Sequence, residues 1–75
     1  MDEQITVDPK ILVGKPVIKG TRIPVYVVLN LLANGKTIQE IVREYPELTP
    51  ENIFAAIAYA AAHMRYETKQ LETAR

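Results

Sequence analysis

Hydrophobic and polar positions divide the chain into a short extended part and a longer helical part. Residues 5–24 are rich in β-branched side chains, and turn-forming residues interrupt them at Asp8-Pro9, Gly14, Pro16, Gly20 and Pro24. This pattern is typical of short strands joined by turns. Residues 5–7 and 17–18 are the best strands, and together they predict an N-terminal β-hairpin. After residue 24 the spacing becomes helical.

Residues 25–34 admit two interpretations. The first four favour a strand, and Asn34-Gly35 is compatible with a type I′ hairpin turn. The next segment provides no second strand, because Thr37 and Glu40 have the spacing of a capping box, which marks the start of a helix. We therefore interpret residues 25–34 as a buried helix, with Gly35 in the left-handed conformation just past its end.

A second and a third helix follow. The second has apolar residues on one face, at Ile38, Ile41, Val42 and Tyr45. Pro46 ends it, because proline cannot continue the hydrogen-bond ladder. Thr49 suits the N-cap of the third helix, Pro50 its first position and Glu51 its first turn. No helix breaker follows Pro50, so the third helix is expected to reach about 39 Å and to project from the domain.

Ten consecutive apolar residues, 53–62, lie within the third helix, whereas a surface helix shows a single apolar stripe. We expect one group to serve the core of the chain itself: Ile53, Ile57, Ala60 and Met64. The remaining group predicts a homodimer interface: Phe54, Ala58, Ala61 and Ala62. The alternative is that the N-terminal hairpin wraps around this helix.

Composition limits the possible functions. The chain has 75 residues, with nine Lys or Arg, nine Asp or Glu, one His and no Cys. It is one domain at most, and a core this small is a poor setting for a deep substrate pocket. Without Cys there is neither a disulfide nor a thiolate metal site, and His63 has no neighbouring Ser, Cys or Asp to serve in catalysis. We expect no cofactor, no metal and no enzymatic activity.

The amino terminus is acidic, and no apolar stretch follows closely. This predicts the absence of a secretory signal, and no apolar run approaches the roughly 20 residues that span a bilayer. We therefore expect a cytoplasmic chain with no membrane partner.

Four cations occur between positions 10 and 22 with no acid among them: Lys10, Lys15, Lys19 and Arg22. In a chain of zero net charge, this cluster indicates a polyanion partner such as duplex DNA. The alternative is that solvated lysines decorate exposed turns and discourage aggregation.

The second and third helices have the connectivity of a helix-turn-helix, with Leu48 in the corner. Asn52, in the first turn of the third helix, could pair with adenine, although it could equally serve the helix cap. Glu51 would repel phosphate. The predicted nucleic-acid contacts are therefore the four cations of residues 10–22 together with Asn52.

Several motifs resemble one bacterial family. The segment ITVDPKILVGKPVIKGTRIPV is followed by ANGKTIQEIVREYPELTPENIFAAIAYA. Over residues 5–66 these are similar to the domain-of-unknown-function 433 family, whose most characteristic segment is matched by Gly20, Thr21 and Arg22. The resemblance implies a homeodomain-like or winged-helix-like domain. Many members are antitoxin-like partners of PIN-type ribonuclease toxins, so it also implies a DNA-binding, autoregulatory antitoxin.

The sequence thus predicts a single, mainly α domain over residues 1–75. A strand-and-turn arm, 5–24, precedes a three-helix, helix-turn-helix bundle, 25–66, whose long last helix ends in a tail, 67–75, that frays or orders on a partner. The alternative function is a dimeric protein-interaction module with a purely architectural helix-turn-helix, which net neutrality and Glu51 favour.

Overall fold

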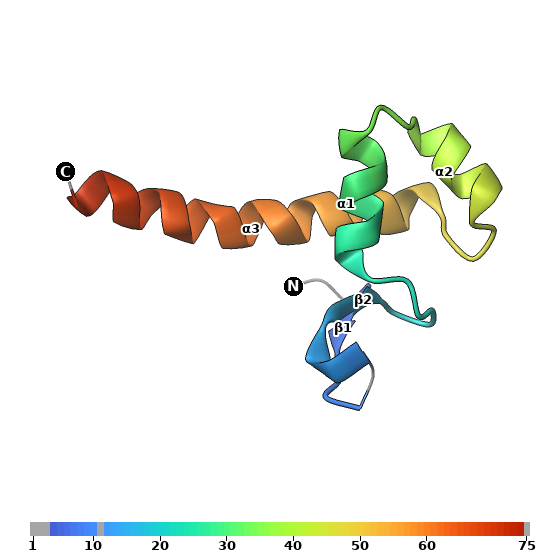
Figure 1. Ribbon diagram of the computed structural model, residues 1–75, viewed down its shortest axis with the longest axis horizontal. Coiled ribbons are helices and arrows are strands. Elements are labelled where there is room, and N and C mark those ends of the chain that lie inside the picture. The colour runs from blue at the N-terminus through green and yellow to red at the C-terminus, as the bar shows by residue number, and fades with distance from the viewer. Residues whose placement is uncertain (1–3, 11, 75) are drawn as a thin grey trace.

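A short β-hairpin leads into three helices, and the last helix is much the longest (Figure 1). The computed structural model describes residues 4–10 and 12–74, and the side chains of all these except 12 and 66–74. The elements in chain order are β1 (Ile5–Val7), a 3₁₀ turn (Leu12–Gly14), β2 (Pro16–Ile18), α1 (Val25–Ala33), α2 (Ile38–Glu44) and α3 (Pro50–Ala74). The predicted class, mainly α with an N-terminal hairpin, is confirmed.

The two strands pair antiparallel, with Ile5 opposite Ile18 and Val7 opposite Pro16. A tight turn follows β2, in which the Ile18 amide donates to the Ile23 carbonyl at 3.0 Å. The Thr21 hydroxyl donates to the Ile18 carbonyl at 2.8 Å and accepts from the Ile23 amide at 3.0 Å. These bonds fix the turn through a side chain, as Ser and Thr commonly do in turns.

Helix α1 ends as the sequence predicts. Gly35 has φ +91°, its amide donates to the Leu32 carbonyl, and the Lys36 amide donates to the Leu31 carbonyl, both at 3.0 Å. This is the Schellman arrangement, which a left-handed glycine completes. The helical interpretation of residues 25–34 is therefore confirmed, and the hairpin alternative is wrong.

Reciprocal caps start the next two helices. The Thr37 hydroxyl accepts from the Glu40 amide at 3.1 Å, and the Glu40 carboxylate accepts from the Thr37 amide at 2.8 Å, which confirms the capping box. At the start of α3 the Thr49 hydroxyl accepts from the Asn52 amide at 3.2 Å, and Asn52 Oδ1 accepts from the Thr49 amide at 2.9 Å. Local sequence thus determines both helix starts.

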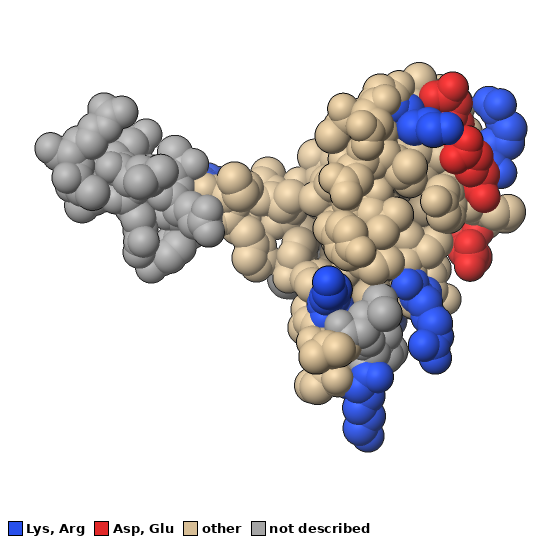
Figure 2. All heavy atoms as spheres, viewed as in Figure 1, with Lys and Arg blue, Asp and Glu red and all other residues tan. Residues whose placement is uncertain are grey.

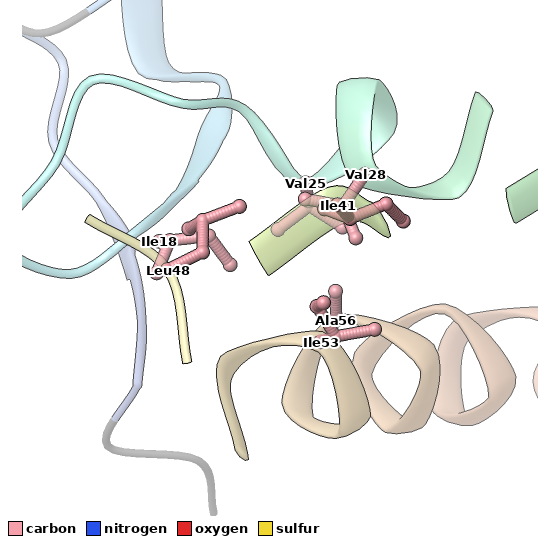
Figure 3. Packing of buried hydrophobic residues seen from close by; sticks show 7 residues of the cluster. All are labelled: Ile18, Val25, Val28, Ile41, Leu48, Ile53 and Ala56. Carbon is pink, nitrogen blue, oxygen red and sulfur yellow. The ribbon is translucent and has the colours of Figure 1, made fainter. Parts of the chain in front are cut away.

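The core joins β2 to the three helices and to the corner between α2 and α3 (Figure 3). Leu48, only 2% exposed, fills the corner between α2 and α3, as expected for a helix-turn-helix. The buried cluster is Ile18, Val25, Val28, Ile41, Leu48, Ile53 and Ala56. The predicted inner face of α2 is confirmed, because its remaining apolar residues pack against this cluster: Ile38, Val42 and Tyr45.

Helix α3 carries one face into the core and then projects beyond it (Figure 1). The radius of gyration, 13.6 Å, exceeds the roughly 11 Å expected of a compact chain of this length. The inner face differs from the predicted one: Ile53 and Ala56 are buried, whereas Ile57 is 41% and Met64 58% exposed. The expectation that Ile57 and Met64 serve the core is therefore wrong, because the buried positions of α3 are Ile53, Ala55 and Ala56, and Ile57 lies at the edge of this face. No helix of the described residues combines the length and apolarity needed to cross a membrane.

Candidate functional site

The four predicted cations lie at two ends of the hairpin. Lys10 and Lys15 flank the 3₁₀ turn that connects the strands, and Lys19 and Arg22 belong to the turn that follows β2. The strand register puts these turns at opposite ends of a three-residue ladder, about 10 Å apart. All four residues are exposed. We call these four residues the basic arm.

Few carboxylates compete with the basic arm. Within residues 5–24 the single acid is Asp8, and its carboxylate accepts a hydrogen bond from the Lys10 amide at 2.9 Å. Lys15 Nζ lies 5.0 Å from the centre of the Tyr26 ring, a cation–π contact that keeps the ammonium against the start of α1. The surface view shows Lys and Arg side chains over the hairpin, whereas the Asp and Glu visible in that view lie over α2 and the corner before α3 (Figure 2).

Val13 is a feature of the arm that the sequence did not indicate. It is 93% exposed and has φ +57° and ψ +39°, a left-handed conformation that is strained for a β-branched residue. It therefore presents an apolar side chain between Lys10 and Lys15. No local signal could have predicted this, because valine disfavours positive φ.

Asn52 already has partners, and through Gln4, whose carbonyl accepts from the Lys19 amide at 2.8 Å, it is linked to the turn that carries Lys19. Besides its part in the α3 cap, its Nδ2 donates to Gln4 Oε1 at 2.6 Å, which ties the start of the hairpin to α3. The sequence left two roles open for Asn52, contact with adenine and capping of the third helix, and the structure shows the capping role. A base contact by Asn52 stays a prediction.

The corner before α3 is acidic. Lys36 Nζ donates to Glu44 Oε2 at 2.7 Å, and this bond together with the charge of Glu44 raises the pKa of Lys36 above its ordinary value. Glu47 and Glu51 are both exposed beside the first turn of α3. The part of the helix-turn-helix that would face a major groove thus carries negative charge.

Helix α3 exposes apolar side chains beside its buried face. Phe54 is 58% exposed, and Ile57 and Met64 are the other large exposed apolar residues of this helix. Ala58 and Ala61 lie between them and are exposed as well. We call these five residues the α3 stripe. Because the hairpin leaves them uncovered, the alternative in which the hairpin wraps this helix is wrong.

A shallow groove continues the α3 stripe toward α2. It has a volume of about 580 Å³ and is mainly apolar. Its lining residues are Ile38, Gln39, Val42 and Arg43 of α2, and Pro50 and Phe54 of α3. Phe54 belongs to both, so the groove and the stripe form one continuous apolar surface. We call this cavity the α2–α3 groove.

Within the described part of the chain, no group of three or more His, Cys, Asp or Glu side chains is placed to hold a metal ion. His63 is exposed, its Nδ1 lies 3.0 Å from the Tyr59 carbonyl oxygen, and its ring centre is 4.3 Å from that of Tyr59. These contacts are local to one turn of α3.

The chain forms a small, mainly α domain. Its hairpin carries the basic arm, its second and third helices meet in a helix-turn-helix corner, and its projecting helix exposes apolar side chains. The profile of the family described as "Protein of unknown function (DUF433)" matches residues 5–60. The chain belongs to this DUF433 family, and the resemblance seen in the sequence is confirmed.

Two relatives extend the comparison. The chain is 41% identical over 61 residues to the uncharacterized protein y4eO of Sinorhizobium fredii, a match that covers 81% of this chain and 28% of that protein. It is 74% identical over 23 residues to an uncharacterized protein of Archaeoglobus fulgidus, covering 31% of this chain and 64% of that one. The chain therefore spans less than two thirds of either relative.

A solved structure shares the fold. The crystal structure of a DUF433 member from Anabaena variabilis superposes with a TM-score of 0.73 at 30% identity, covering 96% of this chain and 69% of that one. The fold of this chain is thus similar to that of this DUF433 member.

Proposed function

We propose that this chain is a cytoplasmic DNA-binding module of an antitoxin-like protein, and that it contacts phosphates through the basic arm. The observation that carries the proposal is the exposure of Lys10, Lys15, Lys19 and Arg22 within residues 5–24, a segment whose single acid is Asp8. Ammonium and guanidinium groups on such turns displace counterions from a duplex, and this release supplies most of the non-specific affinity.

The geometry favours the arm over the helix-turn-helix as the contact surface. Glu47 and Glu51 at the start of α3 would repel a phosphate backbone, whereas Lys and Arg side chains cover the hairpin (Figure 2). Exposed Val13 between two lysines would add an apolar contact in a groove, as small apolar side chains do in proteins that bind the minor groove. The role of the chain is binding rather than catalysis.

The toxin-directed part of the proposal depends on the family resemblance. An antitoxin of this type would pair with a PIN-type ribonuclease and regulate its own expression. The predicted contact segment, residues 67–75, lies outside the side chains that the structure describes. Co-expression with a neighbouring PIN-type reading frame, followed by co-purification and a ribonuclease assay, would test this part separately.

A second candidate function is a protein-interaction module with an architectural helix-turn-helix. The acidic corner before α3 and the exposed α3 stripe favour it. Under this alternative the basic arm is a solvated surface and DNA affinity is absent.

Measurements of duplex binding at several salt concentrations distinguish the DNA-binding module from the protein-interaction module. We expect the logarithm of the association constant to fall linearly with the logarithm of salt concentration. A Lys10→Ala, Lys19→Ala, Arg22→Ala variant should lose about three units of this slope, roughly one per removed phosphate contact. Lys15 is left in place because it also contacts Tyr26.

Arg43→Ala is the matched control, because Arg43 is an exposed cation on α2, outside the arm. It should leave the slope unchanged. Binding that is indifferent to salt, or equal losses in the control and the arm variant, would refute the DNA proposal and favour the protein-interaction module.

A further inference from the structure

The α3 stripe has the spacing of a coiled-coil seam. Phe54, Ile57, Ala61 and Met64 occur at intervals of three, four and three residues, which are the a and d positions of a heptad. All four are exposed, and because Ile57 lies one turn after Ile53, this seam runs beside the buried face of α3. Such a seam is complete only when a second helix packs into it.

The exposed area of the chain has the size that a partner would cover. The chain exposes 5594 Å², whereas a compact monomer of 8.5 kDa is expected to expose about 4,700 Å². The excess, about 900 Å², reflects the projection of α3 beyond the core. Each partner in a protein interface of ordinary size covers roughly 800 Å².

We propose that the occupant is a second copy of this chain, packed antiparallel along the α3 stripe. A two-fold axis near residue 59 sets Phe54 opposite Met64 of the second copy, and Ile57 opposite Ala61. The first pair is an aromatic–thioether contact, and the second fits a large side chain against a small one. Ala62 falls outside this seam, although it belongs to the predicted interface.

Charge complementarity selects the antiparallel orientation. Ala58 then lies beside Ala58 of the second copy, and the residues seven positions away on either side, Glu51 and Arg65, face each other across the interface. Both are exposed and carry opposite charges. The symmetry produces this pair twice. In a parallel pairing the heptad sets Arg65 beside Ala60, so neither charge gains a partner.

The same orientation explains the α2–α3 groove. The helix of the second copy, after passing Phe54 with its Met64, continues past Pro50 and therefore along the groove that Ile38 and Val42 line. The projecting end of each α3 thus covers the groove of the other copy. This pairing involves neither the basic arm nor DNA, so it stands or fails independently of the proposed function.

Engineered disulfides test the orientation directly, because the chain has no cysteine of its own. Ile57→Cys and Ala61→Cys chains are prepared separately and oxidised alone or mixed. In the antiparallel dimer a disulfide joins residue 57 of one copy to residue 61 of the other, so the mixture should cross-link roughly tenfold faster than either variant alone. Both positions are exposed, so neither change should affect the fold.

Ala62→Cys, which is exposed but outside the seam, is the control for random collision. Cross-linking of each single variant with itself at the rate of the mixture would show parallel pairing and overturn the proposal. Cross-linking no faster than the Ala62→Cys control would show that the stripe does not bind a second copy.

A charge exchange provides a second test. Glu51→Arg alone and Arg65→Glu alone should each weaken dimerisation by about threefold to tenfold, because each places like charges together twice per dimer. The double variant restores opposite charges and should recover the affinity of the unchanged chain. Losses that simply add in the double variant would contradict the antiparallel contact.

Discussion

Two neighbouring residues of α3, Ile53 and Phe54, should have different effects on the free energy of unfolding when each is replaced by alanine. Ile53 is fully buried in the core, whereas Phe54, the next residue, is 58% exposed on the α3 stripe. Ile53→Ala removes three buried carbon atoms and leaves a cavity, which costs about 2–5 kcal/mol. A chain of 75 residues has a total free energy of unfolding of about 4–11 kcal/mol, so this single change should remove a large part of it.

Phe54→Ala removes a larger side chain from a solvated position. In the monomer it should lower the free energy of unfolding by about 1 kcal/mol, because the ring is only partly buried beside the α2–α3 groove. In the proposed dimer it removes the aromatic contact with Met64 and should abolish the dependence of the unfolding midpoint on protein concentration. Urea unfolding, followed by circular dichroism at two widely separated protein concentrations, measures both effects.

Two results would contradict the assignment of Ile53 to the core and Phe54 to the surface. One is a dilute Phe54→Ala monomer that loses as much stability as Ile53→Ala. The other is an Ile53→Ala chain whose unfolding midpoint is unchanged. Either result would mean that the inner and outer faces of α3 are not those of the structure.

Further predictions concern the caps. Thr37→Ala should lower the free energy of unfolding by about 0.5–2 kcal/mol in urea titrations, because it removes the N-cap of α2; no loss would contradict the capping box. The hydrogen bond from the Thr37 amide lowers the pKa of Glu40 below its ordinary value of 4.5, so its stabilisation is present above that pH and lost as the pH falls through the lowered value. Between pH 7 and pH 3 the melting temperature of Glu40→Gln should therefore fall less than that of the unchanged chain. An equal fall in both chains would contradict this. Gly35→Ala should cost about 1 kcal/mol from its positive φ alone, since no atom lies within 4 Å of the added carbon; a neutral result in urea titrations would contradict that strain.

Local signals in the sequence predicted the elements and their ends well. The capping box of Thr37 and Glu40, the break at Pro46 and the left-handed Gly35 each depend on residues a few positions apart, and all are present in the structure. Strand β2 begins one residue earlier than predicted, at Pro16, within the usual uncertainty of element ends.

Contacts between distant residues could not be predicted. Every face of residues 53–62 is apolar, so periodicity could not show how far the core would extend around α3, and Ile57, expected to be buried, is 41% exposed. The bond between Gln4 and Asn52 joins residues 48 positions apart. The four cations lie on two turns because of the way the strands pair. Their spacing along the sequence does not predict this pairing.

The central claim is that α3 has two apolar faces, one for the core of the chain and one for a second copy. Sedimentation of the unchanged chain over a wide range of concentrations tests it most directly. The account predicts a species of twice 8.5 kDa that dissociates on dilution and is absent in Phe54→Ala. A well-folded species of 8.5 kDa at every concentration up to the millimolar range would contradict it.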